Sequence, residues 1–165
     1  MIPRVYIHHD TYITVAPHLN LVNVQHRQEH YPRSNLGYYA FYQYFIERDG
    51  KTVQCRPERD PTVEFKKPHK NSISICLAGN FDKQDFPVVQ LEALTTLLHQ
   101  LHQRHGITPL HVLEHRDYQA TSCPGSKFEK GIFAKYFAKS EYTGVQLAFW
   151  EAILEIAAVI RKKHV

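Results

Sequence analysis

Short runs of β-favouring residues alternate along this chain with longer segments of helical periodicity, and this alternation limits the folds open to it. Strands are predicted where branched and aromatic side chains gather, at residues 4–8, 39–48, 51–56, 72–78 and 110–114. Asp49-Gly50 between two of these runs predicts a hairpin turn. Strands that alternate with helical segments predict a single α/β domain, with a mixed central sheet flanked by helices.

Two helices are predicted between these strands. Residues 87–105 repeat leucine at helical spacing, Asp85 can cap the start, Pro87 suits the first turn, and Gly106 follows the end. Residues 17–30 form a second helical segment, which Pro17 opens. Its buried face is expected to carry Leu19, Val22 and His26. A polar loop is expected at 61–71, a short helix near 127–137, and an amphipathic helix at 145–163.

Composition narrows the class of protein. The 165 residues are 43% hydrophobic and 22% charged, as in ordinary soluble domains. No apolar stretch approaches the roughly 20 residues that span a membrane, and the N-terminal sequence MIPRVYIHHD lacks the pattern of a secretion signal. We therefore expect a protein that is cytoplasmic as synthesised. Its net charge of +4 is scattered and forms no basic stripe with interleaved aromatic residues, so no nucleic-acid partner is expected.

Histidine and cysteine residues suggest a metal site. His8 and His9 end one predicted strand, His115 follows another, and Cys123 comes eight positions later on a loop. Two histidines and a thiolate could close three sides of a tetrahedral zinc site and leave the fourth to water. The spacing alone is a weak signal, because a chain with 12 histidines produces such sets by chance. A buried structural histidine and an inert thiol are the alternatives. The three cysteines cannot all pair, which fits a reducing compartment and core positions for Cys55 and Cys76.

Four local segments make the signal more specific. YIHHD, LGYYAFYQYFIERDG, SISICLAGNFD and EHRDYQATSCPG occur in this order. Together they resemble the zinc-dependent N-acetylmuramoyl-L-alanine amidases, a family that includes phage amidase-lysozymes and peptidoglycan recognition proteins. The resemblance extends from Val5 to Phe128, which is most of the chain.

The resemblance implies a set of site residues. The family's metal ligands fall on His8, His115 and Cys123, with His9 as a neighbour of the site. Its active-site tyrosine falls on Tyr42, and a second catalytic position falls on Thr121. Tyr42 also lies in an aromatic run that suits a core, and Thr121 could be a loop cap.

Other positions around these motifs are expected to support the site. Arg116 and Asp117 are expected to brace the loop before Cys123. The chain departs from the family at Gln43, where histidine is common, and at Ser74 and Glu114, where glycine is common. The loop 61–71 lacks the family's usual Ala-His segment. None of these departures affects a ligand position.

The resemblance further implies zinc-dependent hydrolysis of the amide bond between N-acetylmuramic acid and L-alanine, by a phage or prophage endolysin. Residues 1–140 would form the catalytic domain, and residues 141–165 a C-terminal helix packed on it. The alternatives are a cytoplasmic amidase that recycles soluble muropeptides and a non-catalytic peptidoglycan-binding module, which typically lacks the cysteine ligand. The partners implied are peptidoglycan or muropeptides. The sequence does not identify substrate-binding residues, the accepted stem peptides or the oligomeric state.

Overall fold

The computed structural model describes residues 2–15, 17–61 and 71–129, together with 131, 132, 137 and 152. Within them the strands are β1 (Arg4–His9), β2 (Tyr44–Ile46), β3 (Thr52–Gln54), β4 (Ser72–Leu77) and β5 (Val112–Glu114). The helices are α1 (His18–Gln28) and α2 (Val88–His105), and the 3-10 turns η1 (Pro109–His111) and η2 (His115–Asp117) flank β5. The strands form one sheet in the order β3-β2-β4-β1-β5.

The sheet is mixed, as predicted. β1 pairs in parallel with β4 and β5, β2 pairs in parallel with β4, and β3 runs antiparallel to β2. Since the parallel strands end at the same edge, the carboxyl ends of β1, β4 and β5 lie close together. His8 and His9 therefore lie at the edge of an α/β sheet where ligand sites typically form.

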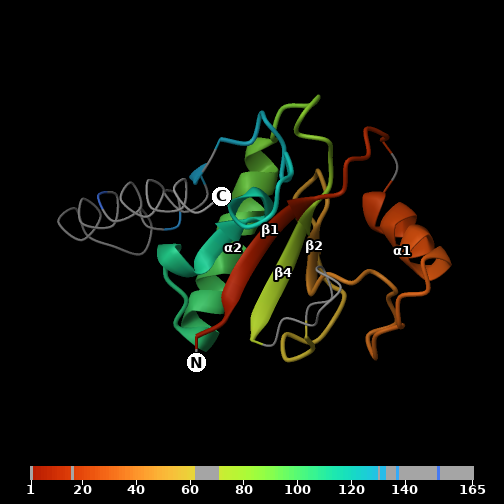
Figure 1. Cartoon of the computed structure of the whole chain (residues 1–165), viewed down its shortest axis with the longest axis horizontal. Helices are drawn as coiled ribbons and strands as arrows, with labels where there is room; N and C mark the ends of the chain where they lie inside the picture. The colour runs from red at the N-terminus through yellow and green to blue at the C-terminus, as the bar shows by residue number, and fades with distance from the viewer. Residues whose placement is uncertain are drawn as a thin grey trace.

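Each face of the sheet has its own apolar cluster. Val5 and Ile7 of β1 join the leucines of α2 in the larger cluster. Because successive side chains of a strand point to opposite faces, Tyr6 and His8 point to the other face. There α1 contributes Leu19 and Val22 to a second cluster with residues of β2 and β4. Figure 1 shows α2 running along the sheet and α1 lying on the side of β2.

The boundaries of α2 differ from the prediction at one end. The predicted leucines 91, 94, 98 and 101 are buried, and Gly106 ends the helix in the left-handed conformation with φ 68°. Asp85 does not cap the start, which is formed by Pro87 without a side-chain hydrogen bond. The Asp85 carboxylate instead accepts a hydrogen bond from the Nζ of Lys127 at 3.1 Å. The prediction of the helix is confirmed, and the prediction of its cap is wrong.

The strand predicted at 39–48 is much shorter in the structure. Only Tyr44–Ile46 pairs in the sheet, because side chains bind the backbone groups before it. Asn23 Oδ1 accepts hydrogen bonds from the N–H groups of Tyr39 and Ala40, and the Ala40 carbonyl accepts one from Arg56. The strands predicted at 51–56 and 110–114 are likewise reduced to Thr52–Gln54 and Val112–Glu114.

Several predictions fall outside the described residues. These are most of the loop 61–71, nearly all of the helix 145–163, and the boundary between residues 140 and 141. Residues 127–129 are not helical, so the start predicted for the helix near 127–137 is wrong. Among the described residues, no helix combines the length and apolar character needed to cross a membrane.

Candidate metal centre

The structure brings the three predicted ligand residues together. His8 lies near the end of β1, and His115 begins η2 directly after the neighbouring strand β5. Their Nδ1 atoms are 3.2 Å apart. The loop after η2 returns Cys123, whose Sγ lies 3.9 Å from the Nδ1 of His8. The candidate ligand atoms of all three residues lie within 4.8 Å of one another.

The donor set and its spacing fit zinc. Two imidazole nitrogens and one thiolate are common zinc ligands, and tetrahedral bonds of ordinary length would separate the donor atoms by about 3.3 to 3.6 Å. The separations of 3.2 and 3.9 Å in this site bracket that range. His8 and Cys123 are buried and His115 is partly buried. A metal could therefore be held at the surface with one side open.

Electrostatics distinguish Cys123 from the other two cysteines. Burial alone raises the pKa of the Cys123 thiol, but hydrogen bonds with His115, His8 and the His9 backbone outweigh this and lower it to about 7. Burial raises the pKa of Cys55 to about 12 and also raises that of Cys76. A thiol must lose its proton to bind a metal. Cys123 is therefore the cysteine suited to metal binding.

His9 is placed as a neighbour of the metal centre. Its backbone N–H donates to the Sγ of Cys123 at 3.4 Å. Its ring lies on the opposite face of β1, where Nδ1 accepts a hydrogen bond from the N–H of Phe81 at 3.2 Å. Burial lowers the pKa of His9 to about 4, so the ring is neutral at pH 7. His9 thus supports the thiolate through its backbone.

Gln119 was not identified from the sequence. Its Oε1 lies 2.7 Å from the Nε2 of His115. When Nδ1 of His115 binds a metal, the ring proton is on Nε2, and Gln119 Oε1 can accept a hydrogen bond from it. Such second contacts commonly fix the orientation of ligand histidines. Gln119 follows His115 by four positions, a spacing that is too common to single it out in the sequence.

Tyr42 lies beside the three ligand candidates. Its ring centroid is 5.6 Å from that of His8, and the side chain is buried in the second cluster. The hydroxyl group is hydrogen-bonded to Cys76, which stands opposite His8 in the pairing of β1 with β4. The ring also lies 5.7 Å from that of His26, a residue of α1. Tyr42 thus belongs to the core and borders the site at once.

Thr121 is exposed on the loop that carries Cys123. Its Oγ1 accepts a hydrogen bond from the N–H of Cys123 at 3.2 Å. The loop-cap alternative is therefore realised in the structure. This contact uses the hydroxyl oxygen as an acceptor, so it does not exclude a role of the hydroxyl as a donor.

Arg116 fixes the Cys123 loop from within, in line with its predicted bracing role. Its guanidinium donates to the carbonyls of Gly125 at 2.9 Å and Phe128 at 2.7 Å, and its backbone N–H donates to the carbonyl of Cys123. Glu114 accepts a hydrogen bond from Nε of Arg116 and another from the N–H of Gly131. Glu114 thus anchors this brace, although glycine is common at its position.

Gln43, where histidine is common in the family, has a structural role. It is fully buried. Its Oε1 accepts a hydrogen bond from the N–H of Ser74 at 2.9 Å, and its Nε2 donates to the carbonyl of Asp60 at 2.9 Å. Both ends of the amide are therefore used inside the fold, and the side chain links β4 to the loop after β3.

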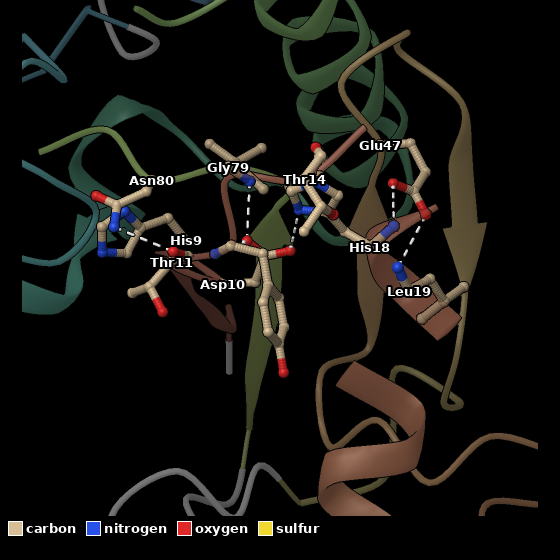
Figure 2. A network of polar contacts seen from close by, with 12 residues as sticks. His9, Asp10, Thr11, Thr14, His18, Leu19, Glu47, Gly79 and Asn80 are labelled. Carbon is tan, nitrogen blue, oxygen red and sulfur yellow. Dashed lines mark hydrogen bonds and ion pairs between the residues drawn. The ribbon is translucent and has the colours of Figure 1, made fainter. Parts of the chain in front are cut away.

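A polar network fixes the chain that leaves the site after His9. The Asp10 carboxylate accepts a hydrogen bond from the N–H of Gly79 at 2.9 Å and lies 2.8 Å from Nδ1 of His18 (Figure 2). Glu47 accepts hydrogen bonds from the first two N–H groups of α1, those of His18 and Leu19. The network joins the ends of β1, β2 and β4 to the start of α1, and so holds His8 at a fixed position.

A cavity of about 640 Å³ adjoins this network, since His18 and Glu47 also line the cavity. It is lined by residues 13–15 and 17–20, by 47–49, Lys51 and Val53 of the hairpin, and by Tyr38 and Gln84. None of the five predicted site residues lines it. The cavity is therefore separate from the candidate metal centre.

Comparison with known proteins agrees with the geometry. The family described as N-acetylmuramoyl-L-alanine amidase matches residues 2–126. Among solved structures, the amidase LysC from Clostridium intestinale matches with a TM-score of 0.65 and 22% identity, over 87% of this chain and 88% of that one. Drosophila peptidoglycan recognition protein SD matches at 0.61 and 25% identity, over 75% of each chain. A Drosophila PGRP-LB mutant in complex with tracheal cytotoxin matches at 0.63 and 22% identity, over 76% of each. No curated protein sequence matches the chain.

Proposed function

Because the chain belongs to the N-acetylmuramoyl-L-alanine amidase family, we propose that it is a zinc-dependent enzyme. The reaction is hydrolysis of the amide bond between N-acetylmuramic acid and L-alanine in peptidoglycan. The observation that carries the proposal is the convergence of His8, His115 and Cys123, whose ligand atoms lie within 4.8 Å of one another. In this proposal the three side chains hold zinc, which supplies Lewis-acid chemistry for amide hydrolysis.

The remaining residues act on the substrate or on the ligands. Gln119 and the backbone of His9 orient His115 and the Cys123 thiolate, respectively. Tyr42 is proposed to turn its hydroxyl from Cys76 toward the substrate carbonyl and to donate a hydrogen bond as negative charge develops there. Thr121, on the loop that carries Cys123, is proposed as a second hydrogen-bond donor to the same carbonyl oxygen. Loss of one donor of this kind typically slows a reaction roughly 100- to 1000-fold.

An endolysin role is proposed for the enzyme. The structural likeness to the endolysin amidase LysCS from Clostridium intestinale, which covers 87% of this chain, supports this role. A non-catalytic binding module is the rival, because recognition proteins share the fold. The presence of Cys123 beside His8 and His115 favours the enzyme over that module, since binding alone requires no such thiol.

The test is muropeptide release from purified peptidoglycan, with the zinc content determined on the same sample. The proposal expects new L-alanine amino groups, which a chelator abolishes and added zinc restores. Cleavage of soluble muropeptides but not of intact wall would favour the recycling enzyme over the endolysin. Saturable binding to peptidoglycan with neither zinc nor cleavage would refute the enzyme and leave the binding module.

A further inference from the structure

The loop between β4 and α2, residues 78–87, packs tightly against the loop that carries Cys123. A Cβ atom on Gly125 would lie 2.4 Å from the backbone carbon of Phe81, and Gly125 has a φ of +118°. Both facts require glycine at this position. Directly beyond it, the N–H of Lys127 donates to the carbonyl of Phe81 at 2.8 Å. The two loops thus meet backbone to backbone, although they are far apart in the sequence.

Asp82 lies at the centre of this contact and binds the Cys123 loop on both sides of the cysteine. Its Oδ2 accepts a hydrogen bond from the Oγ of Ser122 at 2.8 Å. Its Oδ1 accepts one from the backbone N–H of Ser126 at 2.7 Å. Asp82 is itself fixed, because its N–H donates to Oδ1 of Asn80 at 3.1 Å. One carboxylate therefore spans the segment 122–126, in which Cys123 is the candidate ligand.

These contacts differ in kind from the brace formed by Arg116. Arg116 follows β5 and binds Glu114 of that strand, so it braces the loop from the β5 side of β1. Asp82 follows β4, the strand that pairs with β1 and so stands beside His8. The carboxylate therefore sets the position of the thiol relative to a histidine on a neighbouring strand.

We propose that Asp82 is a positioning residue that holds Cys123 in place for metal binding. The inference rests on the zinc site proposed above. Without this anchor, the loop would have to be ordered at the moment the metal binds, and the free-energy cost of ordering would be subtracted from the affinity. Residues that support a ligand in this way typically contribute 10- to 100-fold to metal affinity.

The test compares Asp82→Ala with Asp85→Ala. Asp85 belongs to the same loop and also contacts the Cys123 loop, through Lys127, but its side chain is 93% exposed and it does not bind the residues beside Cys123. Zinc affinity is measured on the full chain by competition with a chromogenic chelator, and the thermal midpoint is measured on the metal-free protein. Asp82→Ala is expected to bind zinc 10- to 100-fold more weakly, and Asp85→Ala to bind it as wild type does.

A double-mutant cycle with Ser122→Ala adds a readout that general destabilisation would not move. Because Ser122 and Asp82 share a hydrogen bond, Ser122→Ala is expected to weaken zinc binding in the wild type and to have a smaller effect in Asp82→Ala. With cobalt in place of zinc, at limiting metal, the charge-transfer band of the Cys123 thiolate should be weaker in Asp82→Ala than in the wild type. An affinity of Asp82→Ala equal to that of Asp85→Ala, or a cycle that is strictly additive, would overturn the positioning role. If the wild-type protein bound no zinc, the metal centre itself would be refuted, which is a different result.

Discussion

Replacing Gln119 with alanine removes the hydrogen bond that orients His115, at an Oε1–Nε2 distance of 2.7 Å. Loss of such a contact typically costs 10- to 100-fold in metal affinity. Gln119 is exposed, so water can take its place beside the ring. We therefore expect the lower end of this range, about ten-fold, which corresponds to about 1.4 kcal/mol.

Competition with a chromogenic chelator at pH 7.5 measures this change directly, and the thermal midpoint of the metal-free protein reports on the fold. Gln119→Glu is the matched control, because it keeps a carboxyl oxygen within reach of Nε2 and should retain wild-type affinity or exceed it. The metal-free midpoint should be the same in all three proteins, since an exposed side chain adds little to stability.

Two results would contradict this reasoning. Wild-type affinity in Gln119→Ala would show that Nδ1 of His115 is directed at the site without help from Gln119. Equal losses in the alanine and glutamate variants would show that the amide group itself, rather than an acceptor for Nε2, is what the site requires.

Three further predictions concern the site and the fold. Cys123→Ser should lose zinc and cleavage together, and stoichiometric zinc in the purified variant would refute the ligand assignment. Tyr42→Phe should keep its zinc and cleave muropeptides roughly 100-fold more slowly; an unchanged rate measured by amino-group release would remove Tyr42 from the catalytic residues. Burial raises the pKa of Glu58, but hydrogen bonds with Arg104, Tyr44 and His105 lower it below its usual 4.5, so its stabilising contribution is complete above that pH and is lost as pH falls through the lower folded value. Urea titrations should therefore find Glu58→Gln less stable than wild type at pH 7 and nearly equal to it near pH 2.

The fold was largely predictable because its main signals are local. The leucine spacing of α2 and its terminal glycine identify the helix, and the run at 72–78 identifies the buried strand β4. The overlong strand at 39–48 was predicted from aromatic residues that do favour strands. Its pairing is prevented by Asn23, a residue of α1 that binds the backbone of Tyr39 and Ala40. A side chain 16 positions away leaves no local trace in a sequence.

The candidate site, like the fold, was predictable only where its residues belong to local motifs. His8, His115 and Cys123 stand in short motifs whose order and residue types are specific, and the structure places them together. Arg116 was predicted to support them, but Gln119 and Asp82 were missed, because ordinary polar side chains carry no motif of their own. Asp82 is 40 positions from Ser122 and 44 from Ser126, so only the pairing of the strands reveals that it lies beside Cys123.

The distance along the chain between the ligand candidates has a consequence for folding. His8 precedes His115 by 107 positions and Cys123 by 115. A metal that joins them would act as a cross-link and would close nearly the whole described chain into one loop. For a covalent bridge of about 100 residues, the lost entropy of the unfolded chain corresponds to roughly 4.7 kcal/mol. Zinc would then stabilise the protein against global unfolding, and its removal would take away the link between β1 and the segment 115–123.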